Sequence, residues 1–233
     1  MDREKRFHIT DERVESYIRD SLEPYKGFLG DVRDEAVSKG IPVISFETAK
    51  LLEVFVNLSK PQRILEIGTA VGFTAMLMAD GLALSGKIDT VELEPEMAAK
   101  ASENISKAGL KDKIDLIVGD AADVLENLDK SYDFIFIDAA KGQYCRYYEL
   151  CSGMVLPGGM IFADNVLYRG MTAGGAKINR RQQLLVRRLR EYIDTATNDA
   201  RFITDILSIG DGVCISYRKR DRSAETFDSE GQV

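Results

Sequence analysis

Acidic, amide and lysine side chains follow two apolar segments in the second half of the sequence. The run Tyr132–Ile137 is followed by Asp138 and, three residues later, by Lys141, and a second apolar run ends in Asp164 and Asn165. Carboxylate and amide oxygens suit Mg²⁺, Mn²⁺ or Ca²⁺ in six-fold coordination. A lysine beside such a cation is a candidate general base. The candidate metal ligands are therefore Asp138, Asp164 and Asn165, with Lys141 as the candidate base.

These residues also have a purely structural interpretation. Asp and Asn after a strand often cap the next helix, and a lysine at a helix start is often only solvated. The metal interpretation is favoured because neighbouring parallel strands end side by side, where open α/β sheets bind their ligands. Lys141 lies close enough to Asp138 along the chain to face the same pocket.

A glycine turn follows another apolar segment nearer the N-terminus. The residues Ile64–Thr74 read as a strand, a turn and a helix start, with the spacing Glu-x-Gly-x-x-x-Gly. Glycines let the backbone turn tightly and approach a ligand that a Cβ would block. The spacing differs from the Gly-x-Gly-x-x-Gly dinucleotide fingerprint, and a tight structural corner is the alternative. The residues singled out here are Glu66, Gly68, Gly72, Phe73 and Thr74.

The next two predicted strand ends add contacts of the kind that an adenosine group needs. Glu92 ends one strand, where a carboxylate can accept both ribose hydroxyls, and Asp120 and Ala121 end the next, where they could flank an adenine ring. With Glu66 near an ammonium and Thr74 near a carboxylate, these strand ends together predict S-adenosylmethionine as the ligand.

The elements that position these residues form an α/β pattern. Helical spacing over residues 11–22 and 29–38, and a stronger helix after Ser45, predict an N-terminal helical cap. Five strands alternating with helices from Arg63 predict a doubly wound, Rossmann-like sheet; the fifth is expected over Met160–Ala163, after a turn at Pro157-Gly158-Gly159. The β-rich runs 202–209 and 213–217, separated by Gly-Asp-Gly, predict a C-terminal antiparallel hairpin. The expected sheet has seven strands, is mostly parallel, and follows the methyltransferase variant of the fold.

Length, charge and composition narrow the possibilities further. The 233 residues fit one domain, residues 1–219, with a cap over 1–60, a core over 61–219 and a disordered tail over 220–233. The sequence has a single histidine, His8, and its three cysteines lack the spacing of metal ligands. A Ser-His-Asp system and a His-rich zinc site are therefore excluded. We expect a cytoplasmic protein without a membrane span or signal peptide. The net charge of −7 argues against a protein coated in nucleic acid.

The combined motifs resemble the cation-dependent O-methyltransferases, the family that contains the catechol and caffeoyl-CoA enzymes. The resemblance covers about residues 42–217. It implies a class I methyltransferase fold, S-adenosylmethionine and Mg²⁺ (or Mn²⁺ or Ca²⁺) as cofactors, and a homodimer with the N-terminal helices as candidates for the contact. It also implies roles for Asp138, Asp164 and Asn165 as metal ligands and for Lys141 as base. The cofactor contacts that it implies are Val43, Glu66, Gly68, Thr74, Glu92, Ala121 and Asp138.

Three functions remain open from the sequence. The basic segment Lys177–Arg190 and several short motifs most resemble the bacterial tRNA 5-hydroxyuridine methyltransferases, so the leading prediction is methylation of the wobble 5-hydroxyuridine to 5-methoxyuridine, with tRNA as partner. The same segment also reads as a solvated amphipathic helix. The alternative substrate is a small catechol or similar vicinal diol, for which Tyr144, Tyr147 and Tyr168 could line a pocket. A third possibility is a regulatory protein that binds S-adenosylmethionine without catalysis.

Overall fold

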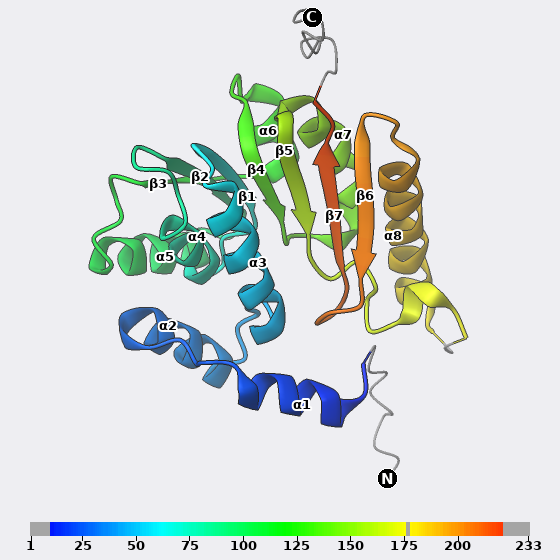
Figure 1. Cartoon of the computed structure of the whole chain (residues 1–233), viewed down its shortest axis with the longest axis horizontal. Coiled ribbons are helices and arrows are strands. Elements are labelled where there is room, and N and C mark those ends of the chain that lie inside the picture. The colour runs from blue at the N-terminus through cyan, green and yellow to red at the C-terminus, as the bar shows by residue number, and fades with distance from the viewer. Residues whose placement is uncertain (1–9, 176–177, 221–233) are drawn as a thin grey trace, which may run out of the picture.

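A computed structural model describes residues 10–175 and 178–220, and its strands form one sheet (Figure 1). His8, Lys177 and nearly all of the expected tail lie outside the described residues. The strands are β1 (Arg63–Ile67), β2 (Lys87–Glu92), β3 (Ile114–Val118), β4 (Tyr132–Ile137), β5 (Val155–Ala163), β6 (Phe202–Leu207) and β7 (Val213–Arg218).

The seven strands follow the order β3-β2-β1-β4-β5-β7-β6. The first five are parallel, β7 is antiparallel to β5, and β6 is antiparallel to β7. The predicted seven-stranded, mostly parallel sheet with a C-terminal antiparallel hairpin is therefore confirmed. Because β1 and β4 are central neighbours, the glycine turn after β1 lies beside the end of β4.

Eight helices accompany the sheet within the described part of the chain. They are α1 (Glu12–Ser21), α2 (Gly27–Ser38), α3 (Phe46–Ser59), α4 (Phe73–Ala79), α5 (Pro95–Lys107), α6 (Ala121–Asn127), α7 (Tyr144–Met154) and α8 (Arg180–Asn198). Two 3₁₀ turns, η1 (Lys141–Gln143) and η2 (Met171–Ala173), precede α7 and α8. Among the described residues, none of these helices is long and apolar enough to cross a bilayer.

Successive residues of β4 point to opposite faces of the sheet, and both faces are covered. Phe134 and Phe136 pack in the core beneath α3, α4 and α5, whereas Ile135 and Ile137 pack beneath α6, α7 and α8. A strand covered on both faces needs apolar residues at every position. This requirement accounts for the continuous apolar run that the sequence shows before Asp138.

Two segments differ from the sequence expectation in their boundaries. The strand expected to begin at Met160 begins at Val155, because Pro157-Gly158-Gly159 lies within β5 at a shift in its register with β4. The helix α3, expected within the cap, buries Leu52 and Val56 in the same core as β1 and β4. The helix α2 also packs Val32 and Ala36 against this core, whereas α1 has no buried residue; both helices lie below the carboxyl ends of the parallel strands in Figure 1.

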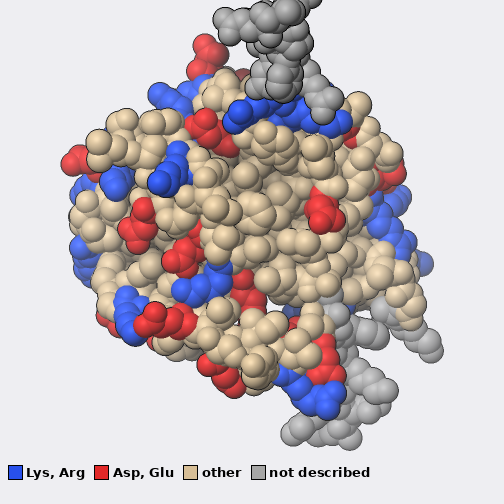
Figure 2. All heavy atoms as spheres, viewed as in Figure 1, with Lys and Arg blue, Asp and Glu red and all other residues tan. Residues whose placement is uncertain are grey.

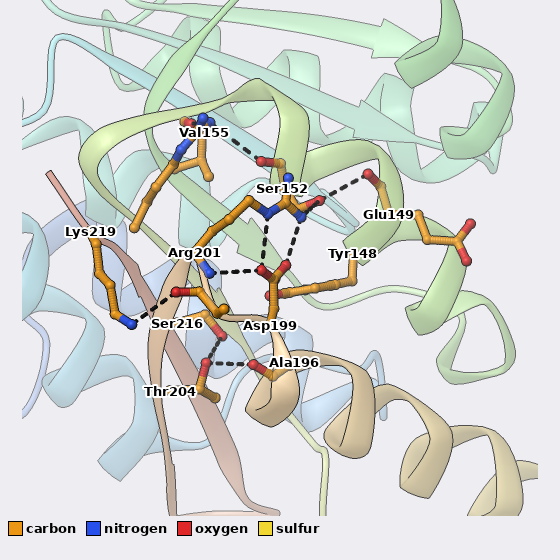
Figure 3. A network of polar contacts seen from close by, with 12 residues as sticks. Tyr148, Glu149, Ser152, Val155, Ala196, Asp199, Arg201, Thr204, Ser216 and Lys219 are labelled. Carbon is orange, nitrogen blue, oxygen red and sulfur yellow. Dashed lines mark hydrogen bonds and ion pairs between the residues drawn. The ribbon is translucent and has the colours of Figure 1, made fainter. Parts of the chain in front are cut away.

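The C-terminal hairpin is anchored by the polar network in Figure 3, which lies at the start of β5 and β6, away from the carboxyl ends of the parallel strands. Arg201 donates to Asp199 Oδ1 through Nε at 3.0 Å and to Ser152 Oγ through Nη2 at 3.0 Å. Tyr148 donates its hydroxyl to Asp199 Oδ2 at 3.3 Å. These contacts join α7, the end of α8 and the start of β6, so α8 is held firmly over the sheet face that faces α7.

Candidate active site

Two carboxylates and an amide meet where β4 and β5 end. Ile137 pairs with Ala163 in the sheet, so the residues that follow them, Asp138 and Asp164, are neighbours. Asn165 adopts a left-handed backbone with φ of 61°, and its Nδ2 donates to Asp138 Oδ1 at 3.1 Å. The structure therefore brings together the three residues predicted as metal ligands.

In the absence of a cation, desolvation disfavours the charged forms of the Asp138 and Asp164 carboxyl groups. It is the main cause that raises the pKa of Asp138, against which the charge of Lys141 acts. Burial and then the neighbouring charge of Asp138 raise the pKa of Asp164 well above its ordinary value. The buried Asp164 and the partly buried Asp138, which is bonded to the Asn165 amide, form a donor set that a divalent cation satisfies, because the cation offsets both their repulsion and their desolvation.

Lys141 opens the 3₁₀ turn between β4 and α7. Its positive charge lowers the pKa of three carboxyl groups, those of Asp138, Asp164 and Asp211, so its side chain lies near all three. The turn closes with a hydrogen bond from Gln143 N to Ala140 O at 2.8 Å. The base predicted from the sequence thus lies near the predicted ligands and lines the same cavity as one of them, Asp138.

Asp211 is a site residue that sequence reasoning missed. It belongs to the Gly-Asp-Gly segment, which was interpreted only as a hairpin turn between β6 and β7. Its Oδ1 accepts from the backbone amide of Arg169, and its carbonyl accepts from Leu167 N at 3.0 Å. These bonds join the hairpin turn to the loop after Asn165, and so place a third carboxylate beside Asp164. An acid between two glycines was the available signal.

A cavity of about 410 Å³ lies over the ends of β1, β2, β3 and β4. Nine of the residues predicted to contact a cofactor, a metal or a proton line it. They are Val43, Gly68, Phe73, Thr74, Glu92, Asp120, Ala121, Asp138 and Lys141. Tyr147 and Gln143 also contribute to its wall, whereas Tyr144 is fully buried and donates its hydroxyl to Asp164 O at 2.9 Å.

Four predicted site residues lie outside the wall of this cavity: Glu66, Gly72, Asp164 and Asn165. Gly72 caps α4 in a left-handed conformation with φ of 83°. Asp164 is buried beside Asp138, so the cation would sit at the edge of the cavity next to β5. Among the residues that the structure describes, no three His, Cys, Asp or Glu side chains form a cluster that could hold a metal ion.

The glycine turn after β1 shapes the floor of the cavity. Gly68 has φ of 101°, and a Cβ at this position would overlap the carbonyl oxygen of Asp138. Only glycine combines this backbone conformation with such a close approach. The turn is held by Glu92, whose Oε2 accepts from Ala70 N at 2.7 Å and whose Oε1 accepts from Glu94 N at 2.9 Å.

Glu66 lies behind the glycine turn as a fully buried carboxyl group. Its Oε2 accepts from Thr90 Oγ1 at 2.5 Å, while its Oε1 is buried without a hydrogen-bond partner. Burial raises the pKa of Glu66 to about 8. An unpaired buried oxygen next to the cavity is a feature that a cationic ligand, or a group polarised by one, would stabilise.

Replacing Glu66 with glutamine is expected to change how stability depends on pH. Because the folded pKa of about 8 lies above the ordinary value of 4.5, the unfolded chain loses this proton first. Below pH 4.5 the carboxyl group is protonated in both states and does not lower the free energy of unfolding. Above pH 8 it lowers this free energy by on the order of 5 kcal/mol. Urea unfolding of the ligand-free protein at several pH values measures it, and Glu66→Gln should gain stability relative to the parent as the pH rises. A constant difference between pH 5 and 9 would contradict this assignment.

A parallel sheet with a C-terminal antiparallel hairpin, and acids at successive strand ends around a glycine turn, define a Rossmann-like methyltransferase. The family model described as O-methyltransferase matches residues 25–219. The chain therefore belongs to the O-methyltransferase family, and the enzyme class expected from the sequence is confirmed.

Curated relatives and solved structures agree with this family. The chain is 34% identical over 165 residues to the catechol O-methyltransferase of Niastella koreensis, which covers 68% of this chain and 75% of that protein. It is 31% identical over 179 residues to the caffeoyl-CoA O-methyltransferase of Stellaria longipes, covering 72% and 73%. The structure of the O-methyltransferase from Bacillus cereus in complex with SAH superposes with a TM-score of 0.78 at 28% identity, covering 89% and 97% of the two chains.

Proposed function

We propose that this protein transfers the methyl group of S-adenosylmethionine to a hydroxyl of a small catechol or similar vicinal diol, with a divalent cation bound. The observation that carries the proposal is the convergence of Asp138, Asp164, Asn165 and Lys141 at the ends of β4 and β5, beside a cavity of about 410 Å³. Names of the relatives support the substrate class, since two of them are a catechol and a caffeoyl-CoA O-methyltransferase.

The cofactor would occupy the cavity. Glu92 lines it and keeps lone pairs beyond those that accept Ala70 N and Glu94 N, so it is the proposed acceptor for the ribose hydroxyls. Asp120 and Ala121 would lie beside the adenine, and Val43 and Thr74 at the methionine end. Bound there, S-adenosylmethionine supplies an activated methyl group. The neighbour from Bacillus cereus was solved in complex with SAH, which supports this use of the fold.

The cation would be held by Asp138, Asp164 and the amide oxygen of Asn165. In the structure, the amide nitrogen of Asn165 faces Asp138, which leaves the amide oxygen available. A bound Mg²⁺, Mn²⁺ or Ca²⁺ lowers the pKa of a substrate hydroxyl and orients it.

Lys141, in its neutral amine form, is proposed to accept the proton that this hydroxyl loses. Its amino group lies near Asp138, Asp164 and Asp211, and it shares the cavity wall with Asp138. Asp211 would accept a hydrogen bond from the second hydroxyl of a diol, a contact that a simple phenol lacks. Holding both hydroxyls limits the motion of the attacking oxygen, which supplies much of the rate in such reactions.

Methylation of tRNA is the second candidate, and exposed basic side chains support it. In Figure 2, lysines and arginines gather along the edge of the molecule over α8. Arg180, Arg181 and Arg187 of this helix are exposed. Arg188 and Arg190, however, donate to the backbone carbonyls Gly142 O and Thr172 O, so they serve the protein itself. Because these two arginines bind backbone carbonyls of the protein itself, they support the interpretation of α8 as a phosphate-binding surface less than the three exposed ones do.

We also propose a homodimer that uses the N-terminal helices. Within α1, Val14, Tyr17 and Ile18 are 46%, 74% and 38% exposed, although they form one apolar stripe. A second copy of the chain would cover such a stripe. Light scattering of the purified protein measures the mass directly, and a monomer across the micromolar range would exclude the proposal.

One assay separates the candidate substrates. Purified protein is incubated with labelled S-adenosylmethionine and either a simple catechol or tRNA lacking the wobble methyl group, with and without a chelator. The proposal expects efficient, chelator-sensitive methylation of the catechol. Transfer to tRNA alone would favour the second candidate. Cofactor binding without any transfer would indicate the non-catalytic regulatory alternative.

A further inference from the structure

The turn that carries Lys141 is held from outside by α8. Arg188 donates through Nη1 to the carbonyl oxygen of Gly142 at 2.5 Å. In the opposite direction, the thiol of Cys145 in the first turn of α7 lies 3.5 Å from the carbonyl oxygen of Arg188 and donates to it. One arginine of α8 therefore contacts the central residue of η1 and the first turn of α7 that follows it.

The turn needs such an external contact. A 3₁₀ turn of three residues has poorer hydrogen-bond geometry than an α-helix, and Gly142 at its centre has wide backbone freedom. Gly142 has no side chain with which to pack, and the position of its missing Cβ lies 3.7 Å from Arg188 Nη1 and 3.8 Å from Leu185 Cδ2. The contacts from α8 thus take the place of side-chain packing at this turn.

The bond is of a strong kind. A guanidinium donating to a carbonyl is charge-assisted, and such bonds are roughly twice as strong as neutral ones. A planar guanidinium on a long stem can reach across from α8, which is itself fixed at its far end by the contacts of Asp199 and Arg201. The carbonyl that it holds belongs to the residue directly after Lys141.

We propose that Arg188 is a positioning residue: by holding the carbonyl of Gly142, it fixes the turn that aims the Lys141 amino group at the substrate hydroxyl. This inference rests on the proposed function for its kinetic consequence and on the geometry of the turn alone for its structural one. It also assigns a role to an arginine whose charge would otherwise be read as a contact for nucleic acid.

Arg188→Met removes the donor and keeps an apolar stem, and Arg188→Lys keeps one donor. The matched control is Arg218→Met, which removes another arginine that donates to backbone carbonyls, those of Val155 and Ser152, at the opposite edge of the sheet. Steady-state kinetics and calorimetric binding of S-adenosylhomocysteine are measured for each variant. Amide hydrogen exchange over residues 139–147 follows the turn itself and needs no turnover.

For Arg188→Met we expect kcat to fall by about ten- to a hundredfold, the scale of a misplaced catalytic group, with little change in the affinity for S-adenosylhomocysteine. Exchange over residues 139–147 should become faster, and Arg188→Lys should recover part of both effects. Unchanged kcat and exchange would overturn the proposal, as would an equal loss of kcat in Arg218→Met. If the parent protein methylates neither substrate class, the proposed function fails, while the exchange data still decide whether Arg188 holds the turn.

Discussion

Lys141→Met lowers kcat by about 10²- to 10⁴-fold, the usual contribution of a positioned general base, and leaves the cofactor bound: this is the largest effect that we expect. The methionine keeps the length and the apolar stem of lysine while removing the group that accepts the proton. The measurement is methyl transfer to a catechol at saturating cofactor, combined with calorimetric binding of S-adenosylhomocysteine.

The variant has a second, separable effect on the acids around it. Because the charge of Lys141 lowers the pKa of Asp138 and Asp164, its removal raises both, and a cation must then displace protons that are held more tightly. Proton competition with Mg²⁺ should therefore extend to a higher pH in the variant than in the parent protein. Assays at saturating Mg²⁺ and mildly alkaline pH remove this contribution and leave the loss of the base.

The control is Lys107→Met, which breaks an exposed ion pair with Glu103 on α5. It should behave as the parent protein does. A loss smaller than about threefold in Lys141→Met under the corrected conditions would be too small for a general base, which contributes 10²-fold or more.

Asp164→Asn should abolish the dependence on divalent cations and most of the activity. A cation at a reacting oxygen contributes several kcal/mol, so the expected loss in kcat/KM is about 10³-fold. Unlike most changes of a buried residue, this one should not weaken the ligand-free fold at neutral pH. The substitution removes a buried acid whose charge is disfavoured by desolvation and by Asp138, so the apo protein should be at least as stable as the parent.

Thermal unfolding with and without Mg²⁺ tests both halves of this expectation. The parent should gain in Tm when Mg²⁺ is added, since a ligand that binds only the folded state stabilises it, and Asp164→Asn should gain nothing. Asp115→Asn, an exposed aspartate in β3, is the matched control. Equal Mg²⁺-induced shifts in parent and Asp164→Asn would remove Asp164 from the metal site.

Much of the site was predictable because parallel strands place their ends together. Once Ile64–Ile67, Thr90–Glu92 and Phe134–Ile137 were recognised as buried strands, their acids and glycines had to meet at one edge. Gly68 was predictable for the same local reason, since the chain turns there under a φ of 101°.

The contributions of Asp211 and Arg188 were not predictable in this way. Asp211 reaches the site because β7 pairs with β5, a contact between segments about fifty residues apart that no local pattern specifies. Arg188 donates to a carbonyl 46 residues away, and a carbonyl leaves no trace in a sequence. The early start of β5 was missed because Pro157-Gly158-Gly159 is typical of a turn, whereas the strand already pairs at Val155 with Tyr132 of β4, before a shift in register.

The strand order has a consequence for how the chain folds during its synthesis on the ribosome. Strand β6 emerges before β7, yet β7 lies between β6 and β5, so β6 has no place in the sheet until the chain is complete to Arg218. The five parallel strands can assemble earlier, with the Lys141 turn and the acids of β4 and β5 already present. Asp211 and the hairpin arrive last, because distant pairings of this kind form slowly. A nascent chain would therefore hold an assembled cofactor cavity well before its substrate pocket is closed.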